Sequence, residues 1–251
     1  MNTHQQRRIL WALALTQVFG TIGVGAAPSI GVLLASEVTQ NEALAGIART
    51  ASTFGAALFG VPLAQLAART SRRTALTTGW ATATVGATIL AWAASGTSMI
   101  LVALGLLLLG AGSAAALQAR FAATDHAADA KRGSALSFIV WVGTIGSVLG
   151  PNIGTPAAVL ASSLGTTLYS AAFALAALAL GVATLLVFAL LPSTKDAAPG
   201  LSTAEQGAGA SGQNKPSLAA KVGAFTREIT GNRQARYAAI SLLGPTWSWC
   251  R

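Results

Sequence analysis

Residues 98–119 read SMILVALGLLLLGAGSAAALQA. No charged side chain interrupts these 22 residues, and a helix needs about 20 mostly apolar residues to cross the hydrocarbon core of a bilayer. The stretch therefore predicts a transmembrane helix. Five further stretches share its length and apolar character, and they lie at residues 9–35, 43–68, 74–94, 134–160 and 166–191.

The composition of the whole chain supports this interpretation. Of its 251 residues 53% are hydrophobic and only 9% are charged, whereas soluble domains carry about 25% charged residues. None of the apolar stretches alternates with a period of two, which a membrane-spanning strand would require. Lipid offers no hydrogen-bond partner to exposed backbone amides, so the stretches must be helices. The predicted fold is an all-α membrane protein in which six transmembrane helices form a bundle.

The basic residues at the ends of the spans predict the orientation. Eight Lys or Arg side chains flank alternate ends of the spans: Arg7, Arg8, Arg69, Arg72, Arg73, Arg120, Lys131 and Arg132. The loops on the opposite side contain none. Cytoplasmic loops are enriched in Lys and Arg, so we expect a multi-pass protein of the plasma membrane with a cytoplasmic N-terminus and a cytoplasmic tail.

The sequence divides into three regions. Residues 1–191 form the predicted transmembrane domain, and residues 192–236 form a cytoplasmic linker rich in Gly, Ala and Ser. Within the linker, apolar side chains recur at helical spacing: Leu218, Val222, Phe225 and Ile229. This spacing fits either an amphipathic helix on the membrane surface or a partly ordered linker. Residues 237–251 are apolar but too short to span, and they look like the truncated start of a seventh helix.

Several kinds of site are not expected. The net charge of +9 comes from short loops and the tail rather than from one basic face, so nucleic acid is not a predicted partner. Cys250 is the single cysteine and His4 and His126 are the only histidines, so we predict neither a disulfide within the chain nor a metal site. The spans hold no catalytic set and no phosphate-binding loop. We therefore predict no enzyme, no catalytic residue and no cofactor.

Three polar side chains within the spans are candidates for a substrate cavity. Arg49 lies about two turns inside the second span, and a guanidinium in lipid is costly unless it faces water or a partner. The alternative is that Arg49 snorkels to the outer interface. Gln17 and Thr21 are one turn apart in the first span. They can face a cavity or form hydrogen bonds between helices.

The loop between the second and third spans resembles a known signature. Residues 64–73 read AQLAARTSRR, which is similar to the pattern G-x-x-x-D-R-x-G-R-[RK] of the major facilitator superfamily. The matching arginines are Arg69, Arg72 and Arg73. Ala64 and Ser71 stand where the pattern has glycine, and Ala68 stands at its acidic position.

The fifth span carries a second and more specific resemblance. Residues 146–154 read GSVLGPNIG, similar to the G-x-x-x-G-P-x-x-G signature of the drug:proton antiporters in that superfamily. The matching positions are Gly146, Gly150, Pro151 and Gly154. The end of the fourth span also resembles those transporters, although Leu106 stands where they normally have an arginine.

The glycines and the proline of the fifth span have clear physical consequences. Gly146, Gly150 and Gly154 are spaced by four residues and share one helix face, so another backbone can approach closely. Pro151 cannot donate to the carbonyl one turn back, which predicts a bend. The resemblance implies that this seam faces the opposite half of the transporter. Ordinary packing within one half is the alternative.

The resemblance implies a fold and a function. It covers residues 7–192 and corresponds to the N-terminal six-helix half of a transporter whose two halves surround a central cavity. The implied function is small-molecule transport by alternating access, with efflux by antiport against protons. Because no carboxylate lies inside a predicted span, a coupling acid would sit at a span end or in another half. The alternative is a non-transporting half that only folds or associates in the membrane.

The resemblance also implies partners and a gate. In the gate, Arg69, Arg72 and Arg73 would pair with Asp125 when the cytoplasmic side closes. The alternative is that these arginines only determine the topology and contact lipid headgroups. One half supplies one cavity wall, so we expect a second half or a second copy of the chain to be needed for transport. The remaining predicted partners are a small-molecule substrate and membrane lipid.

Overall fold

The computed structural model describes residues 3–39, 42–96, 98–125 and 131–191, and all the regular elements in this part of the chain are helices. We call it the transmembrane unit. The elements, in order, are α1 Thr3–Gly25, a π-helical turn Ala27–Gly31, α2 Val32–Thr39, α3 Glu42–Arg69, α4 Arg72–Ala93, α5 Met99–Asp125, α6 Arg132–Leu149, a 3₁₀ turn Pro151–Ile153, α7 Gly154–Leu164 and α8 Leu168–Leu190. The linker and seventh-helix predictions, residues 192–251, lie outside the described residues.

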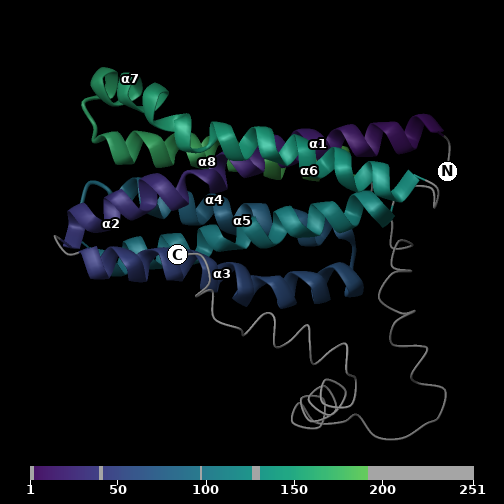
Figure 1. The fold of residues 1–251 in the computed structure, drawn as a ribbon, viewed down its shortest axis with the longest axis horizontal. Helices are drawn as coiled ribbons and strands as arrows, with labels where there is room; N and C mark the ends of the chain where they lie inside the picture. The colour runs from purple at the N-terminus through teal and green to yellow at the C-terminus, as the bar shows by residue number, and fades with distance from the viewer. Residues whose placement is uncertain (1–2, 40–41, 97, 126–130, 192–251) are drawn as a thin grey trace, which may run out of the picture. The chain divides into compact units, whose positions relative to one another are not determined.

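These elements group into the six predicted spans, and the all-α fold is confirmed (Figure 1). Five segments are long and apolar enough to cross a membrane: Arg8–Val38, Thr50–Arg69, Met99–Asp125, Arg132–Leu164 and Leu168–Leu190. The sixth span is α4, whose 22 residues include many threonines. The hydroxyls of Thr82, Thr84 and Thr88 donate to carbonyls of the same helix, so α4 remains compatible with a membrane interior.

Prolines interrupt two of the spans. The break after α6 occurs at Pro151, where the sequence predicts a bend, and Figure 1 shows α7 leaving the line of α6. The first span is also broken, between α1 and α2, which the sequence analysis did not predict. Pro28 lies in this π-helical turn, where the backbone N–H of Gly31 bonds to the carbonyl of Ala26 five residues back, at 3.3 Å. Because proline removes one helical donor, the chain re-forms its hydrogen bonds in a wider turn.

Small residues allow the helices to approach closely. α4 packs between α5 and α8, and α1 packs against α6 and α8. A Cβ atom on Gly86 of α4 would lie only 2.6 Å from the backbone nitrogen of Leu109 on α5. Gly55 of α3 and Gly110 of α5 likewise meet the backbone of the opposite helix. Van der Waals contact between backbones is a main source of helix association in lipid.

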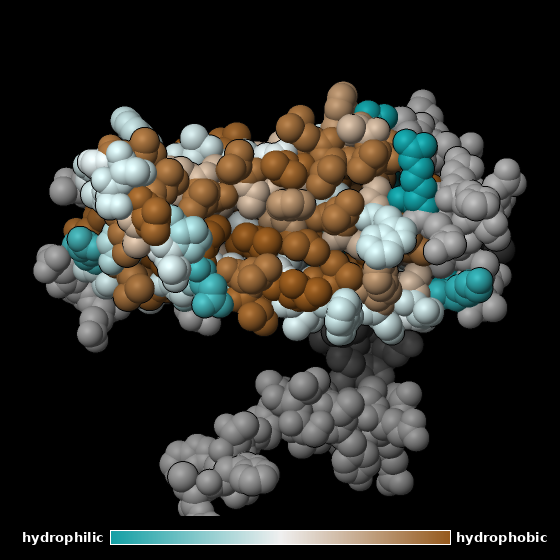
Figure 2. Space-filling model, turned by 90° about the horizontal axis from the view of Figure 1, so that it is seen from above, coloured by the Kyte–Doolittle hydropathy of each residue, from teal (hydrophilic) through white to brown (hydrophobic). Residues whose placement is uncertain are grey.

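Large apolar side chains cover the outside of the transmembrane unit. Leu178 in the middle of α8 is 65% exposed, and Val85, Val159 and Leu185 are similarly exposed. Figure 2 shows a broad apolar band across the middle of one face, with hydrophilic residues toward the two ends. An apolar band with polar ends is the surface expected of a unit surrounded by lipid.

Candidate functional site

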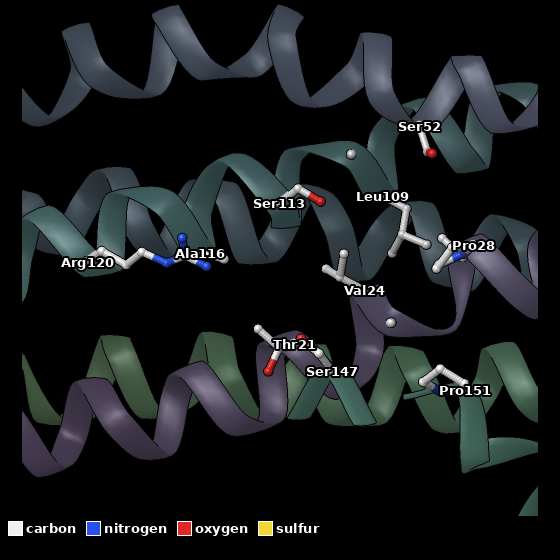
Figure 3. A pocket seen from close by; sticks show the side chains of 13 residues that line it. Thr21, Val24, Pro28, Ser52, Leu109, Ser113, Ala116, Arg120, Ser147 and Pro151 are labelled. Carbon is white, nitrogen blue, oxygen red and sulfur yellow. The ribbon is translucent and has the colours of Figure 1, made fainter. Parts of the chain in front are cut away.

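A cavity of about 400 Å³ lies between α1, α3, α5 and α6 (Figure 3). α5 forms its longest wall, with Leu109, Gly110, Ser113, Ala116 and Arg120. The other walls come from α1 and the π-helical turn, from Ser52 of α3, and from Ser147 and Pro151 of the broken fifth span. Both proline-interrupted spans therefore contribute to the same cavity.

Hydroxyl groups supply most of the polarity of the lining. The Thr21 hydroxyl donates to the carbonyl of Gln17 at 2.6 Å, and the Ser147 hydroxyl donates to the carbonyl of Gly143 at 3.1 Å. Each of these hydroxyls already donates its one proton to a carbonyl, so it can only accept a hydrogen bond from a molecule in the cavity. Ser113 is exposed in the cavity wall. The lining is thus mainly apolar, with a few polar groups, as small-molecule sites generally are.

Arg120 is the one ionisable residue of this lining within the described part of the chain. Its Nε is buried and has no hydrogen-bond partner in the described part of the chain. The apolar run predicts a fourth span that ends at residue 119, with Arg120 in the loop that follows, whereas α5 continues to Asp125. The missed signal is a helical spacing: residues 113, 116 and 120 lie on one face of a helix.

The three predicted cavity residues are placed differently. Thr21 lines the cavity. Gln17 is fully buried and lies against Gly143 of α6 rather than in the cavity wall, and its amide has no hydrogen-bond partner among the described residues. Arg49 lies in α3, but its side chain falls outside what the structure describes.

The glycine seam of the fifth span consists of Gly146, Gly150 and Gly154. It packs mainly against α1, inside the transmembrane unit. A Cβ atom on Gly150 would lie 2.7 Å from the Cα of Gly25 in α1. A Cβ on Gly146 would meet the hydroxyl of Thr21 and, at 2.7 Å, the carbonyl oxygen of Val18. Gly154, in contrast, has no neighbour within 4 Å of such an atom. Thus α1 covers the first two glycines and leaves the third open.

An ion pair connects the arginine loop to the end of α5. The Nη2 of Arg72 lies 2.7 Å from Oδ2 of Asp125, and its Nε donates to the same oxygen at 2.8 Å. Its Nη1 donates to Oε1 of Gln118 at 2.9 Å. Both charged side chains are only 14% exposed. All three contacts hold α5 to the beginning of α4.

The other two arginines of the loop make different contacts. Arg73 donates to the carbonyl of Phe188 near the end of α8, and its guanidinium lies 4.6 Å from the centre of the Phe188 ring. A cation at this place also complements the negative end of the α8 dipole. Arg69 is exposed at the end of α3. Among the three, Arg72 is therefore the partner that Asp125 has in this structure.

Comparison with known proteins agrees with this architecture. Residues 11–248 match the Major Facilitator Superfamily. The chain belongs to this superfamily. Its members are transporters and not enzymes, so the prediction of no enzymatic activity is confirmed.

Two curated relatives from Bacillus subtilis (strain 168) are similar to this superfamily member. "Uncharacterized MFS-type transporter YdeG" is 34% identical over 74% of this chain and 43% of its own length. "Uncharacterized MFS-type transporter YddS" is 35% identical over 63% of this chain and 36% of its own length. The chain therefore spans less than half the length of these relatives.

The structure explains one departure from the superfamily's loop pattern. Ser71 stands at a glycine position but has an extended backbone, with φ of −161°, which any residue adopts. Its hydroxyl accepts a hydrogen bond from the backbone N–H of Thr74 at 3.1 Å, and the Thr74 hydroxyl accepts one from the backbone N–H of Ser71 at 3.2 Å. This reciprocal cap starts α4. Serine therefore fixes the beginning of the helix that carries Arg72 and Arg73.

Proposed function

We propose that the transmembrane unit forms one wall of the substrate path in a small-molecule efflux transporter that works by alternating access. The observation that carries the proposal is the cavity between α1, α3, α5 and α6, which combines apolar walls with hydroxyls and a charge inside a membrane-spanning bundle. Transporters of this kind bind substrate near the midplane between two halves. The alternative is a half that folds and associates in the membrane without transporting.

The ion pair at the beginning of α4 is our candidate for the cytoplasmic gate. Arg72 and Asp125 join α4 and α5 within the unit, so their contact is suited to stabilising one arrangement of these helix ends. Ala68 occupies the acidic position of the loop pattern and is exposed. It cannot contribute a charge, so the gate would depend on Asp125.

We also infer that the ends bearing Arg72 and Arg132 face the cytoplasm. The inference rests on the distribution of basic residues. An impermeant thiol reagent applied to intact cells should then react with Gly96→Cys and not with Thr70→Cys, and the reverse pattern would invert the orientation.

Coupling to protons would have to use groups outside this cavity. None of the lining residues that the structure describes is a carboxylate, and Asp125 on the lining helix α5 is held by Arg72. We therefore place the coupling acid of a proton antiporter at a helix end or in a second half or second copy of the chain.

Transport in proteoliposomes tests the proposed function. The purified chain would be reconstituted with an imposed proton gradient and a panel of fluorescent organic anions and cations. If the cavity carries substrate, any gradient-driven movement should be lost in Ser113→Trp, because an indole on the longest wall obstructs a cavity of about 400 Å³. The matched control is Leu104→Trp, at an exposed position of the same helix.

The outcomes separate the two candidate functions. Movement that Ser113→Trp abolishes and Leu104→Trp preserves would support transport, with a second copy supplying the other wall. Absence of movement from a folded chain that still binds a panel compound would favour the non-transporting half. Equal movement in the two variants would show that the cavity is not the path.

A further inference from the structure

We propose that the cavity binds an organic anion, with the guanidinium of Arg120 as the partner of its carboxylate, sulfonate or phosphate group. The inference rests on the proposed function, since it takes the cavity as the substrate site and names the class of substrate. Nothing in the superfamily match specifies a charge for the substrate.

The first argument is the imbalance of charge in the cavity wall. Among the described residues of the lining, Arg120 is the one that is charged, and no Asp or Glu accompanies it there. A guanidinium stays protonated under all ordinary conditions. The same lining contains apolar groups such as Val24 and Leu109, and an electrostatic attraction beside apolar walls is stronger than in water. The cavity should therefore attract anions and repel cations.

The second argument is that Arg120 has no partner among the residues that the structure describes. Arg72 and Arg73 are held by Asp125 and by the end of α8. Arg120 forms neither a hydrogen bond nor an ion pair within the described residues, and its Nε is both buried and unsatisfied. A buried donor without an acceptor costs about 1–3 kcal/mol, and more when the group is charged. A bound anion would remove this cost.

The third argument is geometric. Figure 3 shows the Arg120 side chain running along α5 toward Ala116, in the direction of Ser113. Arg120 lies two helical turns after Ser113, about 10 Å along the axis. The guanidinium offers parallel N–H donors that match a carboxylate or phosphate in bidentate form, and Ser113 offers a hydroxyl farther along. The apolar wall between these groups suits the carbon skeleton of the same molecule.

The size of the cavity is compatible with such a ligand. Small-molecule sites commonly enclose about 300–1,000 Å³, and this one encloses about 400 Å³. The walls contain Pro28 and Pro151 at the two helix breaks. A flat ring can lie against the apolar part of the lining while its acidic group contacts Arg120. An aromatic acid is therefore a suitable probe.

The test compares two fluorescent ligands of similar shape and opposite charge. Binding of 2-naphthoate and of 2-naphthylmethylammonium to the purified chain in a neutral detergent would be followed by fluorescence anisotropy. We expect the naphthoate to bind at least about ten-fold more tightly than the cation, a ratio that corresponds to one charge-assisted contact. A parallel titration with 2-naphthyl phosphate compares the phosphate with the carboxylate.

Two substitutions of Arg120 test whether this side chain causes the preference for the anion. Arg120→Gln should weaken naphthoate binding by about ten-fold or more, whereas Arg120→Lys should retain part of it because the charge remains. Arg69→Gln removes the same charge from an exposed position outside the cavity and should bind naphthoate like the unmodified chain. Thermal unfolding of each variant checks that the bundle is intact, and Arg120→Lys keeps the test valid if Arg120→Gln does not fold.

Several results would overturn the inference. These are binding of neither ligand at millimolar concentration, a preference for the cation, or equal losses in Arg120→Gln and Arg69→Gln. Failure of transport in proteoliposomes would be a different result. A folded chain that binds naphthoate through Arg120 but moves no substrate would favour the non-transporting half and leave the anion site standing.

Discussion

Replacing Gly150 by leucine is expected to destabilise the transmembrane unit by about 3 kcal/mol, the upper end for overpacking in a well-packed interior. Even a Cβ atom at this position would lie 2.7 Å from the Cα of Gly25 and 2.9 Å from the carbonyl oxygen of Ile22. These atoms belong to the backbone of α1, so they cannot rotate away. The isobutyl group of leucine must therefore push α6 away from α1. Unfolding in detergent, followed by circular dichroism, measures the loss.

Gly154→Leu is the matched control for this substitution. It places the same side chain one turn further along the seam, where a Cβ atom has no neighbour within 4 Å, so its stability should stay within about 0.5 kcal/mol of the unmodified chain. Equal stability of Gly150→Leu and Gly154→Leu would contradict the packing of α1 on the seam. If Gly154→Leu instead reduced transport without reducing stability, the open end of the seam would be the part that meets another half.

Breaking the ion pair between α4 and α5 is the second change with a large expected effect. Arg72→Leu leaves the Asp125 carboxylate, which is 14% exposed, without its cation, and it also removes the donor to Gln118. Removal of one partner from a buried pair costs about 3–5 kcal/mol. We expect a loss near the lower value of that range, because the pair lies at the helix ends and keeps some contact with solvent. Urea or heat unfolding in detergent provides the measurement.

A double-mutant cycle separates the interaction energy between Arg72 and Asp125 from the contributions of their other contacts. The combined variant Arg72→Leu with Asp125→Leu should be more stable than the sum of the single losses predicts, since it leaves no unpaired charge. Arg69→Leu removes an exposed arginine from the same loop and should have little effect. Additive losses in the cycle would show that Arg72 and Asp125 contribute independently, which the contact at 2.7 Å does not allow.

The fold was largely predictable because lipid leaves few structural choices. Apolar runs of sufficient length must be helices in a bilayer, and short loops place them next to each other. The break at Pro151 was predictable for the same local reason, since proline removes a helical donor. The break in the first span contains an equivalent proline, Pro28. The sequence does not predict this break, because the apolar run continues through Pro28 and hydropathy alone does not indicate a change of backbone conformation.

The site was less predictable because hydropathy does not give the direction of a side chain. Arg120 was placed in a loop on account of its charge, but the helix extends past it and turns it into the cavity. Gln17 was expected in the cavity on account of its polarity, yet it points into the contact between α1 and α6. Successive side chains of a helix are turned by 100° about its axis, so the rotation of the helix decides whether a side chain faces the cavity or a neighbouring helix. Only the packing of the neighbouring helices fixes that rotation.

The contact of Arg72 with Asp125 was predictable from the sequence only in part. The sequence predicts a partner for Asp125 among three arginines but does not distinguish them. The distinction comes from the reciprocal cap between Ser71 and Thr74, which begins α4 immediately before Arg72. With its backbone fixed in the first turn of the helix, Arg72 reaches α5 while Arg73 reaches α8.

The accessibility of Ser113 to water tests most directly whether the cavity is part of a hydrated substrate path. With Cys250 replaced by serine, Ser113→Cys would be the one cysteine of the chain. Its rate of reaction with a small water-soluble methanethiosulfonate would be compared with that of Leu178→Cys, in unsealed membranes whose two sides the reagent can reach. Both positions are near the middle of a long helix, but Leu178 is exposed on the apolar outside of α8.

Only a thiolate reacts, and a thiol surrounded by lipid does not ionise. We therefore expect Ser113→Cys to react at least about a hundred times faster than Leu178→Cys, a ratio that reflects a pKa at least about two units lower in a hydrated cavity than in lipid. Filling the cavity with the Ala116→Trp substitution should slow the reaction at position 113 and leave position 178 unchanged. Equal slow rates at the two positions would show that the space between α1, α3, α5 and α6 excludes water, and would contradict its role as a wall of a transport path.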